Sequence, residues 1–116
     1  MKLPGLFLNA KTFQEVPAGT LIFEAGASGT AMFGIVEGQV EVRLPGGAVR
    51  RLGPGETFGE MAIVDSSPRS ATVAAVTDTK LAVIDRRTFL FLVHETPTFA
   101  LQVMSSMAQR LRIEPQ

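Results

Sequence analysis

Residues 53–73 read GPGETFGEMAIVDSSPRSATV, and this stretch interrupts the pattern of short strands and turns around it. A strand is expected to end just before Gly59, because glycine permits a sharp backbone turn or a close approach. Residues 60–64 can then form one short helical turn, whose first N–H groups have no intrahelical partners. Pro68 stops any helix, and Arg69 stands at the start of the next strand. The stretch therefore predicts strand, helical turn and strand, with free backbone donors beside an arginine.

The residue types in this stretch suit an anion that is attached to a sugar. The N-terminus of a helical turn favours negative charge, and the planar guanidinium of Arg69 can pair with two phosphate oxygens at once. Ser70 adds a hydroxyl donor. Glu60 would repel a phosphate, but it can accept a hydrogen bond from a neighbouring sugar hydroxyl, as acidic residues do in dinucleotide sites. Together these groups predict a phosphodiester site.

The chain before this stretch is divided into short pieces by turns. All eleven glycines lie between Gly5 and Gly59, and turn signals recur at roughly the 8–12-residue spacing of a sandwich or barrel. Residues 39–44, QVEVRL, alternate apolar and polar side chains, which is typical of a half-buried antiparallel strand. Further strands are expected at residues 21–23, 32–36, 71–76 and 80–84.

The periodicity changes to helical after Asp85, which is a suitable N-cap. The first predicted helix has one wide apolar stripe, and a second helix is expected to start at Thr96-Pro97, where proline fits the first helical position. The stripes consist of Phe89, Leu90, Leu92 and Val93 in the first helix and of Ala100, Met104, Met107 and Leu111 in the second. The sequence thus predicts an α+β, mainly β protein: an antiparallel β-roll, jelly-roll-like, with a short N-terminal element and two C-terminal helices.

Length and composition fit one domain over residues 1–116. The 11 basic residues balance the 11 acidic ones, so the basic excess of a non-specific nucleic-acid binder is missing. Cysteine is absent, which removes disulfides and thiolate chemistry and permits a reducing cytoplasm. No uncharged stretch approaches the ~18 apolar residues of a membrane span, and the N-terminus lacks a signal-peptide pattern. A cytoplasmic localisation is expected, without direct contact to nucleic acid or membrane.

The sequence does not support an enzyme. Its single histidine, His94, has no partner for a catalytic triad or a metal-binding cupin, and we interpret it as a cation near a helix terminus. No paired carboxylates share a defined face. Neither a catalytic residue, nor a metal ion, nor a cofactor other than a bound ligand is expected.

Two segments of the chain resemble a known family. Phe58-Gly59-Glu60-Met61-Ala62, followed after a spacer by Pro68-Arg69-Ser70-Ala71-Thr72-Val73, is similar to the phosphate-binding cassette of cyclic nucleotide-binding domains. Such domains occur in regulatory subunits of cAMP-dependent protein kinase, in cyclic nucleotide-gated channels and in the bacterial catabolite activator protein. The segments 17–23 and 35–38 resemble the first β-roll strands of that family, so the likeness covers nearly the whole chain.

The resemblance implies a cyclic nucleotide sensor that performs no chemistry on its ligand. It implies that Arg69 binds the phosphate and that Glu60 accepts from the ribose 2′-OH. Ser70 and Ala71 would add donors to the phosphate. Gly59, Met61 and Ala62 would supply backbone contacts, and Val42 and Val49, on strands expected to face inward, would form an apolar wall beside the base. We expect cAMP rather than cGMP, although Ser70 could instead accept a hydrogen bond from the 2-amino group of guanine.

The sequence departs from the family pattern at its C-terminal end. The long helix that usually covers the base stops at residue 116, so the lid is expected to be short or missing. No helix-turn-helix domain follows, which leaves a stand-alone receiver or a fragment of a longer regulator or channel as alternatives.

Two alternatives to the binding site remain open. Arg69 and Glu60 could pair with each other at a buried turn, as arginine and carboxylate often do. The chain would then be a degenerate β-roll with an empty pocket that serves in interaction or dimerisation. The second helix also leaves two alternatives open. Its apolar residues most simply pack on the roll, or they form a homodimer face; these residues are Phe99, Val103, Met104, Met107 and Leu111.

Overall fold

The computed structural model describes the backbone of residues 12–113 and the side chains of residues 12–109, so the predicted N-terminal element lies outside the described residues. The described chain forms two four-stranded sheets in which every paired strand is antiparallel. One sheet has the order β1 (Phe13–Val16), β8 (Thr79–Asp85), β3 (Ala31–Glu37) and β6 (Thr57–Phe58). The other has the order β2 (Leu21–Phe23), β7 (Thr72–Ala75), β4 (Val40–Arg43) and β5 (Val49–Leu52).

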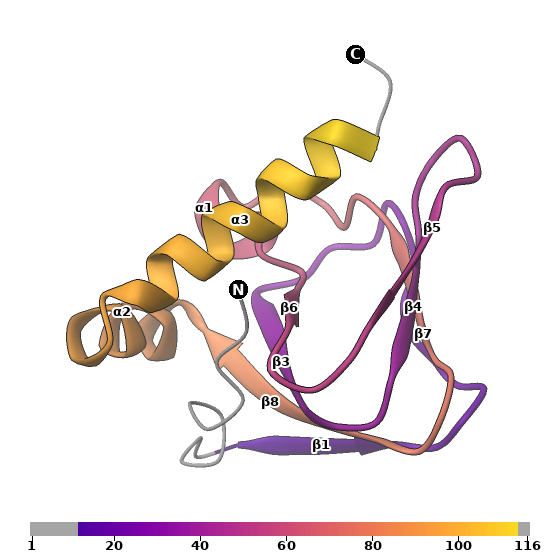
Figure 1. Ribbon diagram of the computed structural model, residues 1–116, viewed down its shortest axis with the longest axis horizontal. Coiled ribbons are helices and arrows are strands. Elements are labelled where there is room, and N and C mark those ends of the chain that lie inside the picture. Colours follow the sequence, from indigo (N-terminus) through magenta and orange to yellow (C-terminus); the bar gives the residue numbers. More distant parts are fainter. Residues whose placement is uncertain (1–11, 114–116) are drawn as a thin grey trace.

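Three helices complete the described fold: α1 (Met61–Val64), α2 (Arg86–Glu95) and α3 (Thr98–Ile113). Figure 1 shows that the strands curl into a roll and that the helices gather at one end of it, with α3 running above β6. The β-roll followed by C-terminal helices confirms the fold class predicted from the sequence. No helix among the described residues is long and apolar enough to span a membrane.

The core has two parts, which lie on opposite faces of the sheet that contains β3 and β8. Phe33, Ile35 and Leu81 point into the space between the two sheets, whereas Met32 and Ile84 point toward the helices. Because both faces are covered, residues 31–36 of β3 and 81–84 of β8 carry no polar side chain. The sequence of β3, AMFGIVE, therefore shows little of the alternation that marks a half-buried strand.

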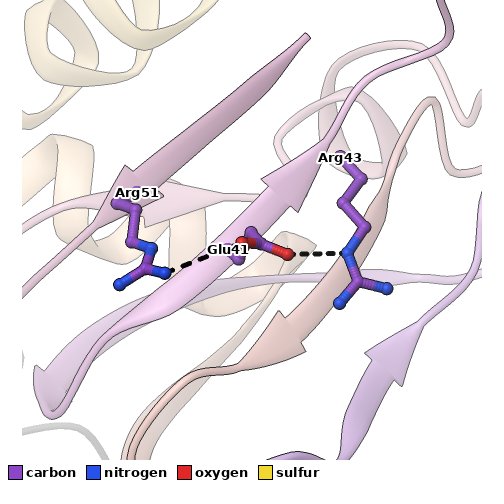
Figure 2. Close-up of polar contacts among 3 residues, drawn as sticks. All are labelled: Glu41, Arg43 and Arg51. Carbon is purple, nitrogen blue, oxygen red and sulfur yellow. Dashed lines mark hydrogen bonds and ion pairs between the residues drawn. The ribbon is translucent and has the colours of Figure 1, made fainter. Parts of the chain in front are cut away.

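The predicted alternation of residues 39–44 is confirmed, because Val40, Val42 and Leu44 are buried. Figure 2 shows the outward face of this strand, where Glu41 lies between two arginines. Its carboxylate is 2.7 Å from Arg43 Nε and 3.9 Å from Arg51 Nη2 on the neighbouring strand β5. These exposed ion pairs contribute little free energy, but they mark which face of the sheet is in solvent.

Both predicted C-terminal helices are present. Asp85 is the N-cap of α2, and its carboxylate accepts a hydrogen bond of 2.7 Å from the Thr88 amide. At the start of α3, the Thr96 carbonyl accepts from the Phe99 amide at 2.9 Å, so the helix begins where Thr96-Pro97 predicted.

The predicted inner faces of these helices are partly wrong. In α2, Leu90 is exposed, while Phe89, Leu92 and Val93 pack against the core beneath the helices. In α3, Met104 is 61% exposed, and the buried positions are instead Phe99, Gln102 and Val103. Several apolar stripes overlap on α3, and its packing against α2, where the Phe99 and Phe89 rings lie 5.6 Å apart, selects one of them.

Candidate functional site

A pocket opens between the α1 turn, the inner face of the β2-β7-β4-β5 sheet and α3. It contains about 490 Å³ of empty space, part of it open to solvent. Most of the residues that the sequence singled out line it, namely Val42, Gly59, Glu60, Met61, Ala62, Arg69, Ser70 and Ala71. The fold thus brings both halves of the predicted phosphodiester site to one place.

The backbone of Arg69 is fixed by the loop that joins β2 to β3. Its amide donates to the Ala27 carbonyl at 2.8 Å, and its carbonyl accepts from the Gly26 amide at 2.7 Å. On the preceding side, Asp65 accepts hydrogen bonds from the Ser67 hydroxyl and from the Ser67 amide. The hydroxyl and then the amide hold the pKa of Asp65 below its usual value. Hydrogen bonds therefore hold the backbone at Arg69 and in the segment just before it.

The Arg69 side chain is buried among aromatic rings, with only 8% of the residue exposed. Its guanidinium carbon lies 4.2 Å from the centre of the Phe23 ring and 5.7 Å from that of Phe33. These rings attract the cation through their quadrupole and restrict its position, but they offer no hydrogen-bond acceptor oxygen. Burial lowers the pKa of Arg69, although an arginine stays charged at any physiological pH.

The hydrogen-bonding capacity of Arg69 is largely unused. Nη1 donates to the Gly59 carbonyl at a long 3.3 Å, and Nε is buried without a partner. Among the described residues, no ion pair joins Arg69 to Glu60 or to another carboxylate. The alternative in which these two residues pair at a buried turn is therefore wrong. A buried guanidinium with an unpaired donor is what an anionic ligand would satisfy.

Two glycines leave room for this guanidinium. Gly59 has φ +83°, and a Cβ there would lie 2.9 Å from Arg69 Nη1. A Cβ on Gly29 would lie 2.4–2.5 Å from three atoms of the guanidinium. Sequence analysis singled out Gly59 but treated Gly29 as an ordinary turn residue, because nothing in the local sequence indicates that Arg69 packs over it.

Glu60 is 1% exposed and occupies the N-cap position of α1. The Ser106 hydroxyl of α3 donates to Glu60 Oε1 at 3.4 Å, so α3 contacts the pocket through the carboxylate of Glu60. Ser106 was missed by the sequence analysis, since a lone serine on a helix carries no signal of such a contact. Thr57 also lines the pocket, and its hydroxyl is buried without a hydrogen-bond partner.

The short helical turn predicted over residues 60–64 is present as α1, but fewer of its amides are free than predicted. The Ala62 amide donates to the Gly59 carbonyl at 3.4 Å, and the Ile63 amide donates to the Glu60 carbonyl at 3.0 Å. A turn this tight satisfies its first donors by i→i+3 bonds. The Ala62 bond is long enough to be exchanged readily for one to a ligand.

The expectation that Val49 faces the pocket is wrong. Val49 is 55% exposed and pairs with Arg43 on the outward face of the sheet, whereas Val42 is buried and lines the pocket. The hairpin between β4 and β5 sets a register in which Arg50 and Leu52 point inward instead. A shift of one residue moves a strand side chain to the opposite face, and the sequence of β5, VRRL, has no alternation that fixes this choice.

Comparison with known proteins links this geometry to one family. The family model described as "Cyclic nucleotide-binding domain" matches residues 13–96. A cyclic nucleotide-gated potassium channel of Mesorhizobium japonicum is 43% identical over 93 residues, which are 80% of this chain and 25% of the channel.

Two solved structures are also similar. The catabolite activator protein of Thermus thermophilus superimposes with a TM-score of 0.74 at 37% identity, covering 93% of this chain and 53% of that one. A structure from work on "a cyclic-GMP-dependent signalling pathway" in bacterial phytopathogenesis gives a TM-score of 0.77 at 31% identity, covering 97% of this chain and 93% of that one. The chain spans about a quarter of the channel and about half of the activator protein.

Proposed function

This chain belongs to the cyclic nucleotide-binding domain family, and from that membership we propose that it binds a cyclic mononucleotide in the pocket beside α1. Arg69 pairs with the phosphate oxygens, and Ser70, Ala71 and the backbone of residues 59–62 surround the same group. The buried, unpaired Nε of Arg69 carries this proposal, because a charged phosphate supplies the acceptors that the guanidinium lacks in the folded chain.

Glu60 binds the sugar in this proposal. Its carboxylate is buried beside Arg69 in the pocket and lies within reach of the Ser106 hydroxyl. A ribose 2′-OH can replace that hydroxyl as donor, so that no buried carboxylate oxygen loses its hydrogen bond. The apolar wall for the base is Val42 and Val73, which line the same pocket.

The proposed role is sensing, without chemistry on the ligand. Among its described lining residues the pocket has one carboxylate, Glu60, and no histidine. It therefore offers no acid–base pair for hydrolysis of a phosphodiester. Among the described residues, no cluster of His, Asp and Glu could hold a metal ion.

The sequence favours cAMP over cGMP as the ligand, although Ser70 could instead accept a hydrogen bond from the 2-amino group of guanine. We propose one binding domain over residues 1–116, of which residues 13–96 match the family model. When a ligand is bound, it contacts both the sheet and the residues next to α3, so occupancy shifts the preferred position of the helices.

The experiment that tests this function is a calorimetric titration of the purified chain with cAMP and cGMP, after nucleotide absorbance has excluded ligand carried through purification. Micromolar affinity, about −8 kcal/mol, is expected for at least one nucleotide. Arg69→Ala should lose roughly 2–4 kcal/mol of that, because it removes a charge-assisted pair, and Glu60→Ala about 1–2 kcal/mol.

The matched control is Arg51→Ala, which removes the same charge from an exposed site on the outward face. It should bind as the unmodified chain does. Equal affinity of the Arg69→Ala and Arg51→Ala variants would refute the assignment of the pocket. It would favour the alternative of an interaction module with an empty pocket.

We also propose a homodimer through α3, with a smaller face than the sequence predicts. Phe99 and Val103 are buried in the core of their own chain, Met107 packs against that core, and the side chain of Leu111 is not among those described. Of the expected face, Met104 remains exposed. Light scattering tests the proposal: Met104→Glu should lower the mass to that of a monomer, and an unchanged mass would argue against this face.

A further inference from the structure

Three neighbouring strands form the floor of the pocket, and they carry one row of inward-facing residues. Val42 on β4 is paired with Val73 on β7 on one side and with Arg50 on β5 on the other. All three line the pocket. The row runs from Val73 on β7 to Val42 on β4 and then to Arg50 on the edge strand β5. Adjacent strands in a sheet lie about 4.8 Å apart. For a ligand whose phosphate lies at Arg69, this row offers the two valines to the face of a base and Arg50 to its edge.

Arg50 is held in place by α3. Its Nη2 donates to Gln109 Oε1 at 2.5 Å, and among the described residues no carboxylate lies within ion-pair distance of it. Arginine can only donate, so the Gln109 side chain must turn its carbonyl oxygen toward Arg50. The Gln109 oxygen keeps a second lone pair, but Gln109 is not among the residues that line this pocket. At the pocket, the pair therefore presents the remaining N–H groups of Arg50, which can only donate.

A side chain that can only donate hydrogen bonds distinguishes guanine from adenine. Guanine has two acceptors side by side, O6 and N7, whereas adenine has the N7 acceptor next to the N6 amino donor. Arg50 can donate to both guanine atoms at once. With adenine, the amino group would face an N–H group, and one partly buried donor of Arg50 would have no partner.

We infer that Arg50, oriented by Gln109, reads the base and makes this pocket prefer guanine to adenine, so that cGMP binds more tightly than cAMP. This inference rests on the proposed function, and it reverses the order that the sequence favours. The sequence does not predict this pair, because Val49 rather than Arg50 is expected to face the pocket.

The first test compares cGMP, cAMP and cIMP by calorimetry on the unmodified chain. Hypoxanthine, the base of cIMP, has the O6 and N7 acceptors of guanine but lacks its 2-amino group. If Arg50 reads the base, cGMP and cIMP should both bind roughly tenfold or more tightly than cAMP, as expected for a bidentate arginine contact. If Ser70 instead accepts from the 2-amino group, cIMP will bind like cAMP, and that result overturns the inference.

The second test removes the guanidinium of Arg50. Arg50→Gln should bring the ratio of cGMP to cAMP affinity to within about threefold of one, because glutamine offers an acceptor as well as a donor. The loss of positive charge acts on both nucleotides alike and cancels in this ratio. Arg51→Gln, the adjacent residue on the outward face, is the matched control and should keep the full preference.

The outcomes separate this inference from the proposed function. If cAMP, cGMP and cIMP all bind with one affinity, or if Arg50→Gln keeps the guanine preference, the base-reading role of Arg50 is refuted and the cyclic nucleotide site stands. If none of the three nucleotides binds to the unmodified chain, the proposed function fails and this inference fails with it.

Discussion

Arg69 shows how a single residue depends on neighbours that are remote in sequence. Its guanidinium lies against the Phe23 ring and directly over Gly29, and both of these precede it by some forty residues. Only a glycine at this position leaves room for the guanidinium, since any Cβ would occupy the same space. The orientation of Arg69 toward the pocket is therefore set by the β2–β3 loop as much as by the segment that leads into β7.

We predict that Gly29→Ala weakens cyclic nucleotide binding about tenfold or more while leaving the stability of the fold nearly unchanged. The new methyl group collides with the end of a flexible side chain, so Arg69 moves and the backbone does not have to. Gly53→Ala is the matched control, because a Cβ there meets nothing within 4 Å. Calorimetric titration and thermal unfolding of both variants check this. A Gly29→Ala variant that binds normally would show that Arg69 is not held in place by this contact.

At the scale of the element, the two C-terminal helices differ in what fixes them. The start of α2 depends on a single cap, because the Asp85 carboxylate accepts from the Thr88 amide and none of the residues of α2 is fully buried. The start of α3 depends on packing, because Phe99 has no exposed surface and lies in the core beneath the helices.

The cap of α2 should make stability depend on acid. The hydrogen bonds from the Thr88 amide and hydroxyl are the main reason that the pKa of Asp85 lies below 3.8 in the folded chain. A lowered folded pKa means that the contribution to stability is fully present above the unfolded pKa and is lost as the pH falls through the folded pKa.

Asp85→Ala should therefore unfold at a lower temperature than the unmodified chain at pH 7, and the difference should shrink as the pH falls below 3.8. Asp85→Asn keeps a side-chain acceptor at the cap without a titrating group, so its melting temperature should stay close to that of the unmodified chain at pH 7. Thermal unfolding followed by circular dichroism across this pH range provides the measurement. A difference between Asp85→Ala and the unmodified chain that is constant down to pH 2 would contradict the assigned role of the carboxylate.

The packing of α3 predicts that two large apolar residues, Phe99 and Met104, contribute very differently to the stability of the fold. Phe99→Ala should destabilise the fold by about 3–5 kcal/mol, because it leaves a cavity beneath both helices. Met104→Ala should change stability by no more than about 0.5 kcal/mol, because Met104 is mostly in solvent. Urea unfolding of the two variants is the test, and similar losses in both would mean that α3 rests on a different face.

At the scale of the whole molecule, three polar contacts among the described residues join α3 to the β-roll. Gln109 accepts from Arg50 at 2.5 Å, Ser106 donates to Glu60 at 3.4 Å, and Gln102 Nε2 donates to the Gly55 carbonyl at 2.6 Å. The first two of these partners are proposed ligand contacts. If Arg50 and Glu60 bind the ligand as proposed, the position of α3 and the occupancy of the pocket are linked in both directions.

We predict that saturating cyclic nucleotide slows amide hydrogen exchange in the segment 102–109 of α3 more than in β1. The reason is that a ligand bridging the sheet and α3 disfavours the opening of that helix, whereas β1 lies in the sheet that does not form the pocket floor. Mass spectrometry of peptides from both segments provides the comparison, with the Arg69→Ala variant as the control without binding. Equal effects on α3 and β1, or none on α3, would show that this helix does not sense the pocket.

The sequence alone predicts the β-roll, the α1 turn, both C-terminal helices and the phosphate end of the site. Each of these is encoded locally, by turn glycines, by an alternating strand, by a cap or by the contiguous stretch 53–73, so no knowledge of distant contacts is needed. The same local signals predict Arg69 and Glu60, because their chemistry differs from that of their surroundings.

Only the tertiary structure decides which face of β5 and α3 is turned inward. The sequence VRRL of β5 has no alternation, and α3 has overlapping apolar stripes, so register and packing against other elements make both choices. These choices bring Arg50 and Gln109 together, and the β2–β3 loop separately places Gly29 against Arg69. A contact between residues 40 or 59 positions apart has no local signal, because the energy that selects it exists only once the sheets and helices have packed.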